Sequence, residues 1–138
     1  MFTPRIQAPK AIRILRKVVR RLAEEDAEFV DGGCADVSFL LAELCKKAGI
    51  PAFFLTGDAV FADGGRCQHA WLEVQGVQYD PVYFFSGVRP RSYDPKPYSI
   101  TDHFGVDTEM AHWQMDDLWK EFGGELSLLA SAPVDANS

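Results

Sequence analysis

One segment constrains the fold of this chain more than any other, and it lies between Gly32-Gly33 and Pro51. The apolar residues in it recur at three- and four-residue steps: Val37, Leu40, Leu41, Leu44, Cys45 and Ala48. This spacing is typical of a helix with one apolar face. Gly49 stands where many helices end in a left-handed residue, and Pro51 prevents continuation. The pattern predicts a helix over residues 34–48 that packs on a core.

A β region is predicted directly after this helix. Residues 52–56 are short, apolar and aromatic, which is typical of a strand. Residues 68–74 alternate with period two, which indicates a second strand. Gln75-Gly76 can form a tight turn. Residues 77–85 then have the pattern of a return strand, in which Pro81 indicates an edge or a bulge.

Two further helices are predicted, one on each side of this central part. Residues 9–29 carry a stripe of apolar side chains at helical spacing, and Pro9 suits a first turn. Residues 108–122 have a similar stripe that includes Met110, Trp113, Leu118, Trp119 and Phe122. Gly123-Gly124 is expected to end that helix. Helices beside a small antiparallel sheet make an α+β fold.

The length and composition indicate one globular domain. The chain has 138 residues, of which 47% are hydrophobic and 25% charged. We expect the domain to span residues 1–125, with a disordered tail over 126–138. Residues 86–107 are rich in Pro, Ser, Asp and Tyr and are expected to form a long surface loop that covers a cleft.

Charge and apolar content exclude several classes of function. The formal net charge of −6 disfavours non-specific nucleic-acid binding. No apolar run approaches the roughly 20 residues that span a bilayer, so no transmembrane segment is expected. The N-terminus lacks the apolar stretch of a secretory signal, and three cysteines are an odd number. We therefore expect free thiols, a cytoplasmic location and no cofactor.

The charges are distributed unevenly along the chain. Residues 10–21 contain six basic side chains and no acidic one. Residues 107–125 contain six acidic side chains and one lysine. These two regions are expected either to face each other or to face two different partners.

Cys34 has the surroundings of a reactive thiol. It follows two glycines and begins the predicted helix over 34–48. A helix N-terminus carries about half a positive charge, which favours the nucleophilic thiolate of a cysteine. The N–H groups of the first turn have no partner within the helix and can stabilise an oxyanion. Cys34 is therefore a candidate nucleophile.

A histidine and an aspartate lie on the two arms of the predicted hairpin. If Gln75-Gly76 is the turn, Trp71 faces Asp80 directly, and His69 shares their face as a diagonal neighbour. Diagonal neighbours are about 7–8 Å apart at the backbone, within reach of their side chains. An aspartate in this place can orient an imidazole and stabilise its charged form. A turn one residue longer or shorter would separate them.

These residues carry a resemblance to a known family. The stretches GGCADVSFLLAELCKKAGIPAFFLTGD and QHAWLEVQGVQYDPV resemble the core of the transglutaminase-like superfamily of papain-type cysteine enzymes. In that superfamily a catalytic cysteine begins a helix, a histidine follows on a strand, and an aspartate in an Asp-Pro pair lies on the next strand. The matching positions here are Cys34, His69 and Asp80, and the resemblance spans about residues 31–82.

The resemblance implies a papain-like core and a catalytic triad of Cys34, His69 and Asp80. The implied activity is attack on an amide or other acyl carbon through a thioester, leading to hydrolysis, deamidation or acyl transfer. The substrate would be a peptide, a protein or a small amide. We expect the backbone N–H of Cys34 to contribute to an oxyanion hole, with Gly33 and Trp71 as further candidates for the pocket.

Two other functions remain open. Some members of the superfamily have lost catalysis, so the chain could be a protein-interaction module on the same scaffold. A zinc site could in principle use Cys34, Cys67, His69, His103 and His112, but their spacing differs from that of structural zinc motifs. Cys45 lies on an apolar helix face and is expected in the core, and Trp71 is expected to pack there. Cys67 is expected on the same strand face as His69.

Overall fold

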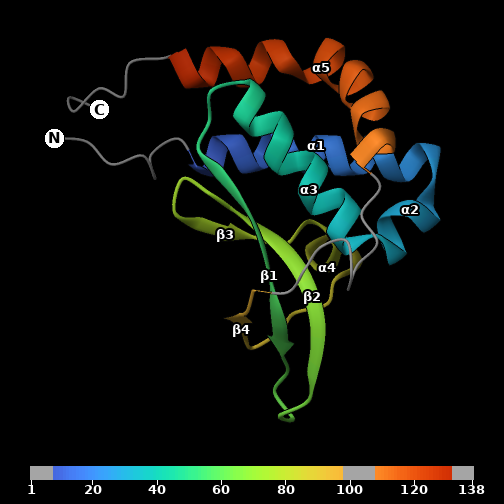
Figure 1. Cartoon of the computed structure of the whole chain (residues 1–138), viewed down its shortest axis with the longest axis vertical. Coiled ribbons are helices and arrows are strands. Elements are labelled where there is room, and N and C mark those ends of the chain that lie inside the picture. Colours follow the sequence, from blue (N-terminus) through green and yellow to red (C-terminus); the bar gives the residue numbers. More distant parts are fainter. Residues whose placement is uncertain (1–7, 98–107, 132–138) are drawn as a thin grey trace, which may run out of the picture.

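The computed structural model describes residues 8–97 and 108–131, and the side chains in these ranges apart from those of 31–32 and 108–113. These residues form an α+β fold, as predicted (Figure 1). Its helices are α1 (Ala8–Glu25), α2 (Ala27–Gly32), α3 (Cys34–Lys47), α4 (Pro81–Ser86) and α5 (Thr108–Ser131). Its strands are β1 (Ala52–Val60), β2 (Arg66–Val74), β3 (Val77–Tyr79) and β4 (Ser92–Pro95). They form one antiparallel sheet in the order β3-β2-β1-β4.

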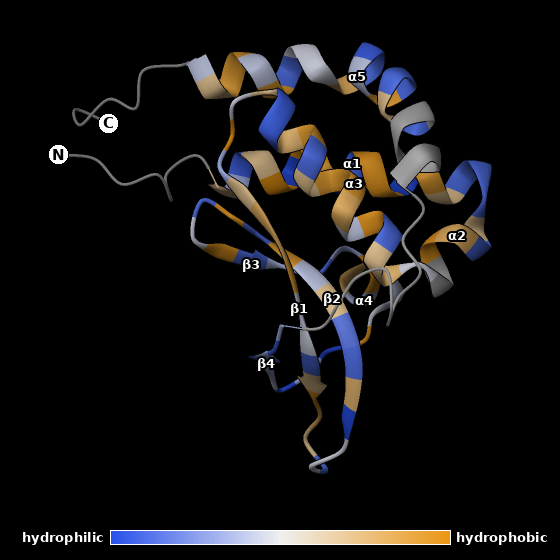
Figure 2. Ribbon diagram, in the orientation of Figure 1, coloured by the Kyte–Doolittle hydropathy of each residue, from blue (hydrophilic) through white to orange (hydrophobic). Residues whose placement is uncertain are grey.

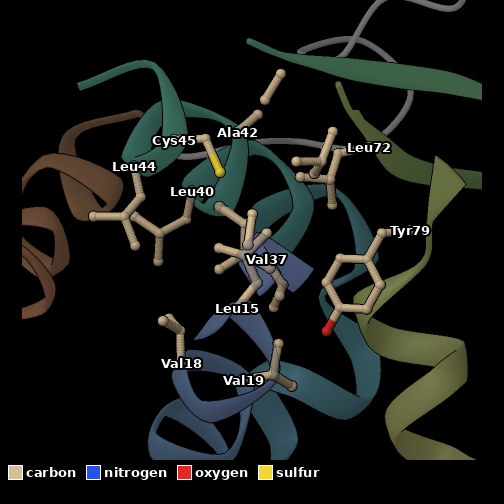
Figure 3. Packing of buried hydrophobic residues seen from close by; sticks show 14 of the residues in the cluster. Leu15, Val18, Val19, Val37, Leu40, Ala42, Leu44, Cys45, Leu72 and Tyr79 are labelled. Carbon is tan, nitrogen blue, oxygen red and sulfur yellow. The ribbon is translucent and has the colours of Figure 1, made fainter. Parts of the chain in front are cut away.

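The core lies where α1, α3 and α5 meet one end of this sheet. Figure 1 shows these helices gathered together while the far ends of β1 and β2 extend away from them. Apolar residues concentrate on the facing sides of α1 and α3 (Figure 2). Fully buried side chains there include Leu15, Val18, Val37, Leu40, Leu44 and Leu72 (Figure 3). Leu41 and Leu126 are fully buried in the same cluster. Each contributes about 1.5–3 kcal/mol by burial, so this cluster holds the helices on the sheet.

The helix predicted over residues 34–48 is confirmed as α3. It begins at Cys34, Ala48 is its C-cap, and Gly49 has a φ of 86°. The left-handed conformation at Gly49 explains why the apolar repeat ends there. The N-terminal end of α3, with Cys34, lies at the junction with α2.

The single helix predicted over residues 9–29 is wrong, because the chain forms α1 and α2 there. Asp26 separates them in an extended conformation. Its Oδ1 accepts hydrogen bonds from the backbone N–H groups of Glu28 and Phe29, at 3.1 and 3.2 Å. An aspartate that caps a new helix favours a break over continuation of the preceding helix, and the spacing of apolar residues does not predict such a break.

The predicted hairpin turn is confirmed, whereas the predicted length of its return strand is wrong. Gln75 and Gly76 both have positive φ, at 49° and 84°, and Leu72 pairs with Tyr79. The strand ends at Tyr79, and residues 81–86 form α4. Pro81 occupies the start of that helix, where its missing N–H costs nothing. It therefore marks neither an edge nor a bulge.

The last helix is longer than predicted. α5 continues through Gly123-Gly124 to Ser131, so its expected end at Phe122 and the expected tail over 126–131 are wrong. A side chain at Gly123 would come within 2.5 Å of the Trp119 ring, so this glycine serves close packing rather than helix termination. Residues 132–138 lie outside the described residues.

The loop predicted over residues 86–107 contains β4. This strand pairs with β1, with Asp58 opposite Asp94. Its short polar sequence lacks an apolar alternation, so nothing local marks it as a strand. Residues 98–107 lie outside the described part of the chain.

The two charged regions face each other in part. Lys17 of α1 lies 3.5 Å from Glu125 of α5, and Arg21 forms an ion pair with Glu121. Within the described ranges, no helix combines the length and apolar character that crossing a membrane requires.

Candidate active site

Cys34 occupies the first position of α3, at a tight junction with α2. Gly33 is the N-cap and makes no side-chain hydrogen bond. A Cβ atom on Gly33 would lie 2.2 Å from the carbonyl oxygen of Phe29, so only glycine fits there. The carbonyl of Gly33 accepts from the N–H of Val37 at 2.8 Å, which begins the helical ladder. Gly33 therefore sets the position of Cys34 by steric necessity.

Two contacts hold the start of α3 against β2. Cys34 is half-buried and packs beside Ala35 and Ala70. The hydroxyl of Ser38, one turn further along α3, donates to the carbonyl of Ala70 at 3.4 Å. Because Ala70 follows His69 in β2, these contacts keep the thiol close to the histidine.

His69 is buried and forms a short hydrogen bond to Asp80. Its side chain is 2% exposed, and Nε2 donates to Oδ2 of Asp80 at 2.6 Å. The side chain of Cys34 lies close enough to the ring to raise the pKa of His69 as well. Since Nε2 is engaged by Asp80, Nδ1 is the ring nitrogen that remains for the thiol. The structure thus brings the three sequence-predicted residues together.

The protonation of His69 reflects opposing effects. Burial lowers its pKa, because a charged imidazolium loses hydration in the interior. Hydrogen bonds to Asp80 and Cys34, together with their charges, act the other way and raise the pKa to about 9. The net effect favours the protonated form of the His69 ring, which the carboxylate of Asp80 stabilises.

Asp80 holds the ring and also begins a helix. Oδ2 accepts from His69 and from the hydroxyl of Tyr93 at 2.8 Å. Oδ1 accepts from the backbone N–H of Tyr83 at 3.0 Å, which caps α4. One carboxylate thereby connects β2, β4 and α4. This arrangement fixes the orientation of the imidazole.

Aromatic rings enclose the histidine. The Tyr83 ring is stacked on the His69 ring, with centroids 3.9 Å apart and planes 10° apart. The centre of the Trp71 ring lies 6.3 Å from that of the His69 ring and 4.8 Å from that of the Tyr93 ring. The side chain of Trp71 is completely buried, as predicted for a packing residue. Its indole N–H has no hydrogen-bond partner among the described residues.

Sequence reasoning missed three residues of this site. Ser38 and Tyr83 had local signals: Ser38 lies four residues after Cys34 on the same helix face, and Tyr83 lies three residues after Asp80, the capping residue of an Asp-Pro pair. Tyr93 had none, because its hydroxyl reaches Asp80 only through the pairing of β4 with β1.

The two other cysteines differ in their surroundings. Cys45 is fully buried in the core, as predicted, and burial raises the pKa of its thiol to about 12. Cys67 is exposed on β2, and its sulfur lies 3.9 Å from the hydroxyl of Tyr83. Cys45 is therefore an unreactive thiol, whereas Cys67 is an accessible internal reference for Cys34.

The zinc site considered from the sequence is not assembled by the described residues. In them, no group of three or more His, Cys, Asp and Glu side chains is arranged to hold a metal ion. The side chains of His103 and His112 lie outside the described residues.

Comparison with known proteins identifies no relative of this chain. The chain matches no protein-family model, no curated protein and no solved structure.

Proposed function

We propose that this protein is a cysteine-dependent enzyme that transfers acyl groups from amides or esters through a thioester. One observation carries the proposal: a buried, hydrogen-bonded pair of His69 and Asp80 lies within electrostatic reach of a cysteine at the first position of a helix. A nucleophile, a base within hydrogen-bonding reach and a residue that orients the base are the elements of thiol catalysis.

The mechanism uses the charge of His69. The thiolate of Cys34 attacks the acyl carbon, and the imidazolium of His69 donates its proton to the leaving amine as the C–N bond breaks. A thioester and a neutral imidazole remain. The imidazole then removes a proton from water or an acceptor amine, which attacks the thioester. The products are an acid or a new amide, and the thiolate–imidazolium pair is restored.

Two N–H donors are proposed for the oxyanion of the tetrahedral intermediate. The backbone N–H of Cys34 is in the first turn of α3, where no helical carbonyl accepts from it. The indole N–H of Trp71 is the second, since it is buried near His69 without a partner among the described residues. A buried unpaired donor costs stability unless a ligand uses it.

The fold supports a papain-like, transglutaminase-like core as part of this proposal. Cysteine at a helix start, histidine on a strand of an antiparallel sheet and aspartate after the next strand follow the order of that superfamily. One departure is that Asp80 begins a short helix instead of lying within the return strand. The substrate class proposed remains a peptide, a protein or a small amide.

Site-resolved alkylation tests the proposal directly. We expect iodoacetamide at pH 6.5 to modify Cys34 at least about tenfold faster than the exposed Cys67, measured by peptide mass spectrometry. His69→Gln should abolish that difference, whereas Cys67→Ser should leave the Cys34 rate unchanged. Equal rates for Cys34 and Cys67 in the wild type would reject a paired thiolate and would favour a non-catalytic interaction module.

Acyl-enzyme formation tests the covalent step. An activated acetate ester should transfer its acetyl group to Cys34, seen by mass spectrometry of the intact protein, and Cys34→Ala should remain unmodified. Trp71→Phe keeps an aromatic ring, although a smaller one than indole, and removes the N–H, so we expect kcat to fall at least about tenfold with KM nearly unchanged. An unchanged kcat in Trp71→Phe would remove Trp71 from the oxyanion hole.

A further inference from the structure

A concave site lies beside α4, and none of the three candidate catalytic residues lines it. It is a pocket of about 410 Å³ between α1 and α4, within the range of small-molecule sites. Three arginines and three aromatic residues line it: Arg16, Arg20, Arg89, Tyr79, Phe84 and Phe85. No acidic residue is among its lining residues. A chain with a net charge of −6 therefore has a locally cationic pocket.

Four basic residues of α1 are divided between two faces of the helix. Lys17 and Arg21 pair with acidic residues of α5, so the acidic helix neutralises that face. Arg16 and Arg20 are four residues apart, hence on one face, and they border the pocket instead. In the described part of the chain, no carboxylate lies within ion-pair distance of Arg16, Arg20 or Arg89.

Arg89 is held in position by the end of α4. Its Nη1 donates to the carbonyl of Val88 at 2.9 Å and to that of Tyr83 at 3.4 Å. Its guanidinium also lies 4.9 Å from the centre of the Phe84 ring. These contacts orient the charge before any ligand binds, which reduces the entropy that binding must remove.

The floor and rim of the pocket are aromatic. Tyr79 extends from β3 toward α1 (Figure 3). Burial raises the pKa of Tyr79, and the charges of Arg16 and Arg20 oppose that shift, which places both guanidinium groups near the ring. Phe85 lines the pocket and is 50% exposed, so part of its side chain is open to solvent there. An exposed ring next to cations is a surface on which a flat ligand can stack.

We propose that this pocket binds a small phosphate monoester that carries a flat ring. Three guanidinium groups without carboxylate partners match a phosphate dianion, because their paired N–H groups fit its oxygens. The ring of the ligand would stack on Phe85. The site is separate from the thiol chemistry of Cys34, so this binding does not depend on the proposed enzymatic activity.

Calorimetric titration of the full chain tests the proposal, with phenyl phosphate and inorganic phosphate as probes. We expect saturable binding of both, with phenyl phosphate about tenfold tighter because its ring also stacks. Arg16→Gln and Arg20→Gln should each weaken binding at least about tenfold. Arg13→Gln is the matched control, since it removes the same charge from the same helix at a position that does not line the pocket, and it should bind as the wild type does.

Two more variants separate the parts of the site. Phe85→Ala should reduce the affinity for phenyl phosphate to that for inorganic phosphate and leave the latter unchanged. Cys34→Ala should bind both probes normally, which distinguishes this site from the candidate active site. In the wild type, phenyl phosphate should also protect Arg16 and Arg20 from phenylglyoxal, read by peptide mass spectrometry, so the test does not require a folded variant.

Three outcomes would overturn the proposal. The first is the absence of saturable binding of either probe at millimolar concentration. The second is an equal loss of affinity in Arg13→Gln and Arg20→Gln, which would indicate general charge attraction. The third is equal affinity for both probes with no effect of Phe85→Ala, which would reject the ring-bearing ligand.

Discussion

At the scale of single residues, Asp80 determines the geometry of the candidate active site. Its two oxygens accept from His69, from the Tyr93 hydroxyl and from the N–H of Tyr83. The residue is 1% exposed, and its hydrogen bond to His69 is fully buried. A buried carboxylate with satisfied oxygens both stabilises the imidazolium and keeps the ring from turning.

Replacing this carboxylate by an amide should therefore be costly. We expect Asp80→Asn to lower the free energy of unfolding by about 3 kcal/mol, since it removes one partner of a buried charged pair. Tyr93→Phe, which deletes only one hydrogen bond, should cost about 1 kcal/mol. Urea denaturation followed by tryptophan fluorescence measures both. Equal losses in the two variants would show that the charge of Asp80 contributes no more to the free energy of unfolding than a single hydrogen bond does.

The pKa of His69 makes stability depend on pH. The pKa is about 9 in the folded protein, above the usual value of 6.5, so folding favours the protonated ring. This stabilisation is fully present below pH 6.5 and is lost as the pH rises through 9. We expect the free energy of unfolding to fall by a few kcal/mol between pH 6.5 and pH 9.5. Urea titrations at several pH values should show this slope in the wild type, and a parallel slope in His69→Gln would contradict the assignment.

At the scale of elements, the short helices α2 and α4 position the site. α2 ends where Gly33 presses against the carbonyl of Phe29, which sets the start of α3. α4 begins at Asp80, and its far end binds Arg89 through backbone carbonyls. The sequence prediction merged the start of α2 into a longer helix over 9–29 and assigned most of α4 to a strand, because a helix of six residues has too few turns to show an apolar repeat.

The junction of α2 and α3 can be tested with one methyl group. Gly33→Ala would place a Cβ atom 2.2 Å from the Phe29 carbonyl oxygen, so the backbone must shift and Cys34 with it. We expect slower alkylation of Cys34 and a loss of stability.

Gly124→Ala is the control for this prediction. Nothing lies within 4 Å of a Cβ at Gly124, inside α5, so this substitution should stabilise the protein by about 1 kcal/mol. Thermal unfolding and the alkylation rate together measure both effects. An unchanged alkylation rate of Cys34 in Gly33→Ala would show that the junction of α2 and α3 does not determine the position of the thiol.

At the scale of the whole molecule, α5 holds the domain together by apolar packing and not by its ion pairs. Leu118, Phe122 and Leu126 of α5 are buried in the main cluster. The pair of Lys17 and Glu125 is half exposed on both sides, and such pairs contribute little.

Truncation of one buried side chain should therefore outweigh the loss of an ion pair. We expect Leu126→Ala to lower the free energy of unfolding by about 2–5 kcal/mol, because it leaves a cavity in the core. Lys17→Gln should change it by no more than the error of the measurement. Urea denaturation of both variants decides the question, and the reverse ranking would mean that the charges hold α5.

The sequence by itself determined the features that depend on neighbours along the chain. The apolar spacing of residues 34–48 predicted α3, and the turn at Gln75-Gly76 predicted the pairing that places Asp80 near His69. These inferences succeeded because helical periodicity and turn chemistry act over a few residues.

Only the tertiary structure decided the features that depend on distant segments. Tyr93 reaches Asp80 because β4 pairs with β1, and the cationic pocket exists because Arg16 of α1 meets Arg89 beyond α4. The same chain packing divides the basic residues of α1 between α5 and the pocket. Contacts of this kind arise from burying apolar surface between elements, which local residue patterns do not encode.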